Sequence, residues 1–198
     1  MVEALNVKKI ISKYILTDEF ELIMDLEKSK GSWLVDKRNG KKYLDLYTMY
    51  GVQPIGYNHP RMLEAIDHLG RVSIQKIACS HIYTEEMAEF FETFSKIGVP
   101  DYLQHAFLIE GGAPAVENAL KTAFDWKIKK NIEMGLNNEE GKQIVYLKES
   151  FHGRTGYALS VTDSRNRVVT KYFPRFEWPC ILNPKVTYPL NIENLAKV

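Results

Sequence analysis

Cysteine is scarce in this sequence, and the two cysteines present are far apart. Cys79 and Cys180 lie outside any CxxC spacing. This number and placement exclude a disulfide scaffold and leave no cysteine signature for a metal site. We therefore expect two reduced thiols with structural roles and no bound metal.

Long apolar runs are also absent. No run approaches the roughly 20 apolar residues that a membrane-spanning helix needs. The segment from Met1 to Lys13 lacks the apolar region and the small-residue cleavage site of a secretory signal. The sequence predicts a cytoplasmic protein that does not interact with membranes.

An excess of one charge is lacking too. The chain carries 26 basic and 25 acidic residues, for a formal net charge of +1. Such a balance gives no electrostatic reason to expect nucleic acid or an anionic membrane as a partner. With 45% hydrophobic residues over 198 positions, the chain has the composition of a soluble globular domain or of part of a larger one.

The N-terminal part combines helical and strand patterns. Residues 32–36 and 41–47 are expected to be two strands around Asn39-Gly40, a dipeptide favoured in two-residue type I′ turns. Asn58-His59-Pro60 is typical of a helix start, with Pro60 in the first helical position. A helical stripe also precedes the hairpin, formed by Val7, Ile10, Ile11, Tyr14 and Ile15.

After residue 84 the pattern changes to that of an α/β fold. A helix should begin near Thr84 and bury Met87, Phe90, Phe91 and Phe94. Two apolar runs of strand length, 105–109 and 143–147, flank a helix that begins at a glycine turn. This order is typical of a βαβ unit with a parallel or mixed sheet. One face of its helix is marked by Val116, Ala119, Leu120, Ala123 and Lys127, with Glu117 and Lys121 paired on another face.

The glycine turn is the first chemical signal. Gly111-Gly112-Ala113-Pro114 stands between a predicted strand and a predicted helix. Free N–H groups at the positive end of a helix suit a phosphate. The turn matches neither the P-loop nor the dinucleotide-binding fingerprint. The alternative is a tight turn that holds no ligand.

The second signal follows the second predicted strand. Phe151-His152-Gly153-Arg154 places an aromatic ring, an imidazole and a guanidinium within four residues. A planar cofactor could stack on Phe151 or His152, and Arg154 could bind a carboxylate through two parallel hydrogen bonds. The alternative is a core phenylalanine, a loop histidine and a solvated arginine.

Together these features resemble class III aminotransferases of fold type I. The resemblance rests on the hairpin from Trp33 to Tyr47, Gly56-Tyr57-Asn58-His59-Pro60, the glycine turn and Phe151-His152-Gly153-Arg154. Residues 110–121 and 173–179 resemble the lysine 6-aminotransferase branch of that family. The resemblance implies a partial fold type I domain of the α/β class, with a mixed, mostly parallel sheet and flanking helices. Residues 1–75 would form an N-terminal small-domain segment of the α+β kind, and residues 76–198 the first part of the large cofactor domain.

The resemblance also implies a cofactor and roles for matched residues. Gly112 and Ala113 would donate backbone N–H groups to the phosphate of pyridoxal 5′-phosphate. Phe151 or His152 would stack on its ring, and Arg154 would bind a carboxylate of 2-oxoglutarate or glutamate. The implied reaction moves the ε-amino group of L-lysine to 2-oxoglutarate, giving glutamate and 2-aminoadipate 6-semialdehyde, in an enzyme that is a homodimer when complete.

In the family, the lysine that forms the Schiff base would fall beyond residue 198. We therefore expect no catalytic residue in this chain, and an N-terminal portion that is inactive alone. The alternatives are a fragment of another ω-aminotransferase, acting on ornithine or 4-aminobutyrate, and a non-catalytic remnant.

Overall fold

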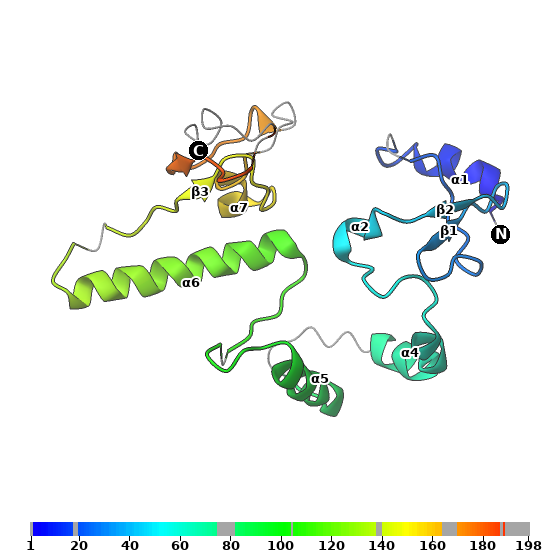
Figure 1. Ribbon diagram of the computed structural model, residues 1–198, viewed down its shortest axis with the longest axis horizontal. Helices are drawn as coiled ribbons and strands as arrows, with labels where there is room; N and C mark the ends of the chain where they lie inside the picture. The colour runs from blue at the N-terminus through cyan, green and yellow to red at the C-terminus, as the bar shows by residue number, and fades with distance from the viewer. Residues whose placement is uncertain are drawn as a thin grey trace. The chain divides into compact units, whose positions relative to one another are not determined.

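The computed structural model describes residues 2–17, 20–74, 82–103, 105–137, 140–163, 170–186 and 188. The chain divides into two compact units, Met1–Gly98 and Val99–Val198, and most of their elements are labelled in Figure 1. Cys79 and the boundary expected between residues 75 and 76 lie outside the described residues.

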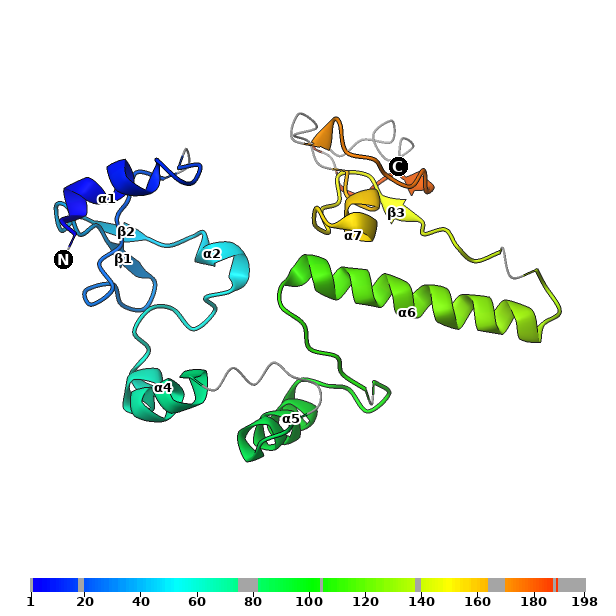
Figure 2. The same cartoon turned by 180° about the vertical axis from the view of Figure 1, so that it is seen from behind.

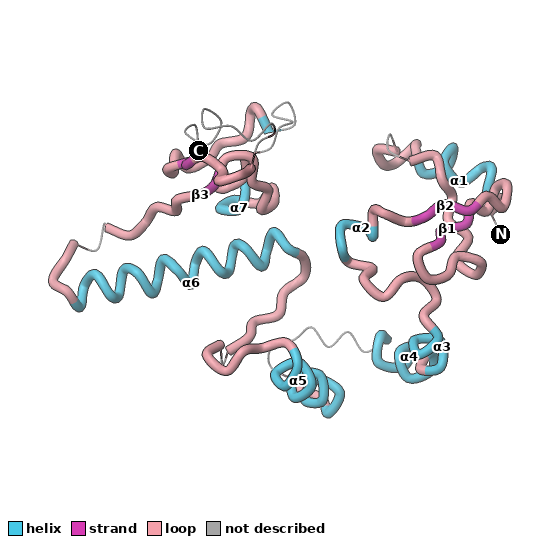
Figure 3. Tube along the Cα trace, in the orientation of Figure 1, coloured by secondary structure: helices cyan, strands magenta, loops and turns pink. Residues whose placement is uncertain are grey.

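The first unit contains a two-stranded antiparallel hairpin and short helices (Figure 3). In the hairpin, Trp33 pairs with Leu44 and Val35 with Lys42, which confirms the two predicted strands. The elements of this unit are α1 (Ala4–Ile11), β1 (Trp33–Val35), β2 (Lys42–Leu44), α2 (Thr48–Gly51), α3 (Pro60–Glu64), α4 (Ile66–Ile74) and α5 (Glu85–Ile97).

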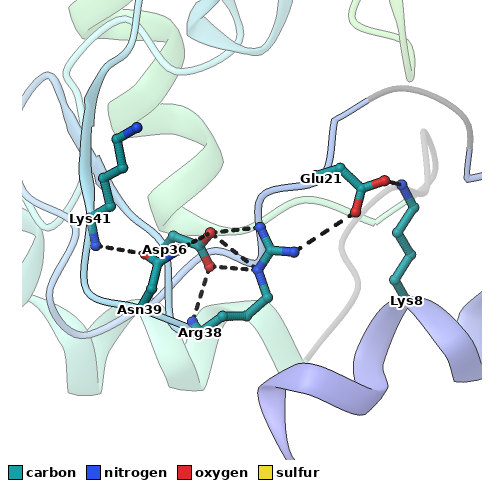
Figure 4. A network of polar contacts seen from close by, with 6 residues as sticks. All are labelled: Lys8, Glu21, Asp36, Arg38, Asn39 and Lys41. Carbon is teal, nitrogen blue, oxygen red and sulfur yellow. Dashed lines mark hydrogen bonds and ion pairs between the residues drawn. The ribbon is translucent and has the colours of Figure 1, made fainter.

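The turn of the hairpin differs from the predicted two-residue type I′ turn. Residues 36–41 connect the strands. Asp36 N–H donates to the carbonyl of Lys41 at 2.9 Å, and Gly40 N–H donates to the carbonyl of Asp36 at 2.7 Å. Gly40 has a positive φ of 73°. The side chain of Asn39 accepts a hydrogen bond from Lys41 N–H at 2.8 Å. The buried carboxylate of Asp36 organises this longer loop, because it binds both the backbone N–H and the guanidinium of Arg38 (Figure 4).

Two helices of this unit begin where the sequence predicts, but the predicted buried face of α5 is not buried. His59 is the N-cap of α3 with Pro60 following it, and the Thr84 side chain accepts from Met87 N–H at 3.2 Å to cap α5. Both predicted starts are confirmed. The predicted apolar face of α5 is not buried, since Phe90 is 47% and Phe94 38% exposed. No other helix or strand within the described ranges packs against α5, so no partner surface covers that face.

The apolar stripe predicted from Val7 to Ile15 is helical only in its first part. α1 ends at Ile11, and Tyr14 and Ile15 beyond it are 82% and 61% exposed. The helix that starts at Pro60 is interrupted at Ala65, where φ is −94° and ψ is 9°.

The second unit contains the long helix α6 (Gly112–Glu133), then β3 (Tyr146–Leu147), α7 (Gly156–Ser160) and β4 (Cys180–Ile181). β3 and β4 are parallel, with Tyr146 beside Cys180 and Leu147 beside Ile181. Only the end of the predicted strand 143–147 is therefore a strand, and its partner is β4. Cys180 is a free, exposed thiol.

The predicted strand 105–109 is not formed. Phe107 is 73% and Leu108 54% exposed, and the segment has no strand assignment. A strand is stable only where a neighbouring strand satisfies its backbone N–H and C=O groups, and the described residues offer this segment no such neighbour. The βαβ unit expected across residues 105–147 is consequently absent.

α7 lies beside the first half of α6 (Figures 1 and 2). The buried core at this contact is small and includes Ala158, Leu159 and Ser160 of α7, followed by Val161 and Thr162. Phe124 of α6 and Tyr157 of α7 extend it, with ring centroids 5.5 Å apart. Val116 and Leu120 of the face marked in the sequence are half-buried, as is Phe124, whereas Ala119, Ala123 and Lys127 are exposed. Within the described part of the chain, no helix combines the length and apolar character that crossing a bilayer requires.

Candidate functional site

The glycine turn and the Phe151-to-Arg154 segment meet at Ala113 and Gly153. A Cβ atom built on Gly153 would lie 2.3 Å from the Cβ of Ala113 and 3.0 Å from its Cα. Real Cβ atoms do not approach so closely, so the contact exists only because residue 153 is glycine. Gly153 is buried and has φ 128°, a conformation that glycine adopts without steric cost. Two motifs that are far apart in the sequence thus form one local structure.

The start of α6 has the features of an anion-binding turn. Gly111 is the N-cap, with φ 92° and ψ 155°, and Gly112 and Ala113 are the first two residues of the helix. No side chain caps this helix and no acidic residue lies in its first turn. The first N–H groups of a helix have no partner inside it, and the helix dipole favours a negative charge at this end.

The space at Gly112 is open. A Cβ built on Gly112 meets no atom within 4 Å, and the residue is exposed. Pro114, the third helical residue, has no N–H to offer. The free donors of this turn are therefore the N–H groups of Gly112 and Ala113, and their position fits a phosphate group.

The buried hydroxyl of Thr162 forms hydrogen bonds with the backbone of the Phe151-to-Arg154 segment. Thr162 Oγ1 accepts from His152 N–H at 2.9 Å and lies 2.9 Å from the carbonyl of Gly153 and 2.8 Å from that of Ala158. A hydroxyl has one proton, so it donates to one of these carbonyls at a time. Thr162 is 0% exposed, and its bonds fix the backbone of residues 152–153.

The side chains of this motif face outward. Phe151 is 61% exposed, and His152 and Arg154 are also exposed. The alternative of a core phenylalanine is therefore wrong. The exposed ring of Phe151, next to a backbone fixed by hydrogen bonds, is available to stack on a planar ligand. The free guanidinium of Arg154 is available to a carboxylate.

Further contacts support the same backbone. Ser150 Oγ donates to the carbonyl of Val161 at 2.9 Å, and Asp163 N–H donates to the carbonyl of Ser150 at 2.8 Å. Arg175 Nη1 donates to the carbonyl of Thr162 at 3.0 Å. The segment that carries Phe151 and Arg154 is thus anchored on both sides.

Glu117 joins the two halves of the site. Its Oε1 atom accepts from Thr155 Oγ1 at 2.7 Å and from Ala158 N–H at 2.9 Å. The expected pair with Lys121 is not formed, because the carboxylate of Glu117 turns to α7 instead. Sequence reasoning missed this residue along with Thr162, and the only local signal was the position of Thr155 directly before a helix.

The residues that the structure describes contain no group of three or more His, Cys, Asp or Glu side chains that could hold a metal ion.

The fold and the site together correspond to one family of enzymes. Residues 14–196 match the family model described as aminotransferase class-III, and the chain belongs to that family. The family predicted from the two motifs is confirmed, and pyridoxal 5′-phosphate is the cofactor of such enzymes.

Its relatives include enzymes that act on lysine. The L-lysine-epsilon aminotransferase of Amycolatopsis lactamdurans is 37% identical over 193 residues, which cover 95% of this chain and 42% of that protein. A solved structure of the lysine aminotransferase from M. tuberculosis has a TM-score of 0.92 at 37% identity and covers 99% of this chain and 46% of that one. The mitochondrial 4-aminobutyrate aminotransferase of Homo sapiens is more distant, at 30% identity over 181 residues, covering 83% of this chain and 36% of that protein.

This chain spans less than half the length of these proteins. Its similarity to the structure of the lysine aminotransferase confirms the fold type I class. Of the mostly parallel sheet that the class implies, the described residues contain the β3–β4 pair.

Proposed function

We propose that this chain supplies the phosphate and ring contacts of a pyridoxal-phosphate-dependent lysine 6-aminotransferase. The observation that carries the proposal is the contact between Ala113 and Gly153, which brings an anion-binding helix start beside an exposed ring and a free guanidinium. Because the chain spans less than half of its relatives, the reaction is proposed for a protein that contains the whole class III fold.

Each residue has a distinct task in this proposal. The N–H groups of Gly112 and Ala113 donate to the phosphate, and the charge of that group is stabilised by the dipole of α6. Phe151, or the adjacent His152, lies against the ring and fixes its plane. When bound, the cofactor supplies the electron sink for proton transfer at the carbon that carries the reacting amino group.

Arg154 is proposed to select the amino acceptor. Its planar guanidinium forms two parallel hydrogen bonds with a carboxylate, which suits 2-oxoglutarate and its product glutamate. L-Lysine is proposed as the amino donor because the relatives named for lysine have higher identity than the 4-aminobutyrate enzyme.

The phosphate site can be tested by one pair of matched variants. Gly112 has room for a side chain and does not have a positive φ, so Gly112→Asp and Gly112→Asn should both fold. The carboxylate of the first variant repels a phosphate, whereas the isosteric amide of the second does not. We expect Gly112→Asp to bind pyridoxal 5′-phosphate at least about tenfold more weakly than Gly112→Asn, with pyridoxal, which lacks the phosphate, unaffected. Equal affinity of the two variants for the phosphate ester would remove the turn from the site.

The donor is tested by turnover in a protein that contains the whole class III fold. Rates with L-lysine, ornithine and 4-aminobutyrate should be compared at saturating 2-oxoglutarate. A higher kcat/KM for lysine supports the assignment, and a preference for either of the others refutes it.

We also propose that residues 1–75 belong to the small domain and residues 76–198 to the cofactor domain. Helix α5 tests this boundary. The proposed boundary at residue 75 assigns α5 to the cofactor domain, whereas in this chain α5 belongs to the first compact unit. Native-state hydrogen exchange in the whole-fold protein would reveal which elements open together with α5. Exchange of α5 in step with α6 supports the boundary at residue 75, and exchange in step with β1 and β2 overturns it.

A further inference from the structure

One carboxylate oxygen ties the start of α6 to the start of α7. Glu117 Oε1 accepts two hydrogen bonds, from Thr155 Oγ1 at 2.7 Å and from Ala158 N–H at 2.9 Å. Glu117 is half-buried, and Ala158 is 0% exposed. A charge-assisted hydrogen bond of this kind is stronger than a bond between neutral groups.

The arrangement replaces the ordinary cap of α7. Thr155 is the N-cap of this helix, but its hydroxyl makes no capping bond; it donates to Glu117 instead. Ala158 is the third helical residue, whose N–H a threonine cap would usually satisfy. The carboxylate of Glu117 takes over that function from another helix, and α7 is capped only while it is docked on α6.

The position of this bond links the two halves of the site. Glu117 lies four residues after Ala113, on the same face of α6. Thr155 follows Arg154 directly in the chain. A Cβ built on Gly156 would lie 3.9 Å from Glu117 Oε1, so the carboxylate sits closely against the first turn of α7.

We propose that Glu117 is a positioning residue for cofactor binding. By holding Thr155 and Ala158, it sets the place of the Phe151-to-Arg154 segment relative to the N–H groups of Gly112 and Ala113. This positioning role rests on the proposed function. In that function the phosphate of the cofactor binds at the start of α6, and its ring binds at the Phe151-to-Arg154 segment, which Glu117 connects to α6. Glu117 itself touches neither the cofactor nor the substrate.

The test uses the full chain with two substitutions at residue 117 and one control. Glu117→Gln keeps an acceptor oxygen at the same place, whereas Glu117→Ala removes it. Glu133→Ala removes an exposed glutamate from the other end of the same helix and controls for the loss of a charge.

Two readouts separate positioning from a general loss of stability. The first is hydrogen exchange of the Ala158 amide without cofactor, which should become at least about tenfold faster in Glu117→Ala, with amides in the middle of α6 unchanged. The second is the circular dichroism that the protein induces in bound pyridoxal 5′-phosphate, measured per bound molecule at saturation. This signal reports how the ring is held, so it should change in Glu117→Ala and be retained in Glu117→Gln and Glu133→Ala.

A reciprocal variant tests the pair directly. Thr155→Val removes the hydroxyl donor and leaves the Ala158 bond in place, so its effect on both readouts should be smaller than that of Glu117→Ala. The double variant should resemble Glu117→Ala rather than the sum of the two, since both changes break the same link.

The outcomes distinguish this inference from the function on which it rests. If a wild-type protein with the whole class III fold fails to bind pyridoxal 5′-phosphate under the conditions of the Gly112 experiment, the proposed function fails, and Ala158 exchange alone decides whether Glu117 holds α7. If the wild-type chain binds and Glu117→Ala retains both wild-type exchange at Ala158 and the wild-type signal of the cofactor, the positioning role is refuted while the phosphate site stands.

Discussion

Gly153 lies so close to the methyl group of Ala113 that a methyl group added to residue 153 would prevent the two segments from meeting. A Cβ on Gly153 would be 2.3 Å from that of Ala113, and the backbone of Gly153 has φ 128°. Both the clash and the backbone conformation oppose any other residue at position 153.

Gly153→Ala should therefore separate the glycine turn from the Phe151-to-Arg154 segment. We expect a loss of about 2–4 kcal/mol in the free energy of unfolding, from the positive φ together with overpacking, measured by urea denaturation. Gly135→Ala is the matched control, because Gly135 has φ 75° with no atom within 4 Å of the added methyl. It should lose only the conformational part, about 1 kcal/mol.

The clash itself can be relieved from the other side. In the double variant Ala113→Gly with Gly153→Ala, the closest atom is removed, and part of the lost stability should return. A double variant no more stable than Gly153→Ala would mean that the contact with the Ala113 methyl does not limit the approach.

Thr162→Val tests the buried hydroxyl behind the second motif. The substitution keeps the shape of the side chain but leaves His152 N–H without its acceptor, which should cost about 1–3 kcal/mol and speed the exchange of the His152 amide. Thr122→Val is the control, since that hydroxyl is exposed and bonds only to the carbonyl of Asn118 in its own helix. A change within about 0.5 kcal/mol is expected there, and equal losses in the two variants would contradict a special role for Thr162.

The ion pair between the buried Asp36 and the half-buried Arg38 should make the first unit sensitive to acid (Figure 4). Hydrogen bonding from the Arg38 guanidinium holds the pKa of the Asp36 carboxyl at about 2, below its ordinary 3.8. A carboxyl whose pKa is lower in the folded state stabilises the fold above its ordinary pKa, and this contribution is lost as the pH falls toward 2.

The measurement for this pair is urea unfolding between pH 6 and pH 2, with Asp36→Asn for comparison. Wild type should be the more stable protein at pH 6, and the difference should shrink below pH 4. A difference that stays constant down to pH 2 would contradict the ion pair as its cause.

Arg154→Lys tests the proposed acceptor site in a protein with the whole class III fold. Lysine keeps the charge but loses the planar fork, so the KM for 2-oxoglutarate should rise by about tenfold, while the KM for L-lysine changes little. Arg61→Lys, at an exposed position in α3, is the control and should leave both constants unchanged. An unaltered KM for 2-oxoglutarate in Arg154→Lys would remove this residue from the site.

Local signals in the sequence determined several features of this chain. Asn39-Gly40 marked the hairpin, Thr84 and Pro60 marked helix starts, and the glycine turn marked the start of α6, since caps, prolines and turn residues act within a few positions of the chain. The resemblance to the family rested on the hairpin, the segment from Gly56 to Pro60 and the two motifs in their order along the chain, and the family is confirmed.

Tertiary structure decided what those signals left open. Residues 105–109 have the composition of a strand but lie exposed, since β structure depends on a partner. The α5 face with Phe90 and Phe94 has helical periodicity but no element in the described unit to bury it. Glu117 bonds to α7 rather than to Lys121, because two hydrogen-bond donors outweigh one exposed ion pair.

The sequence by itself thus determined which segments carry the chemistry, and only the fold decided that they meet. The contact of Gly153 with Ala113 and the bonds of Glu117 with Thr155 and Ala158 join residues far apart in the chain. Such contacts depend on how α6 and α7 pack, and packing is a property of the three-dimensional arrangement that no local pattern encodes.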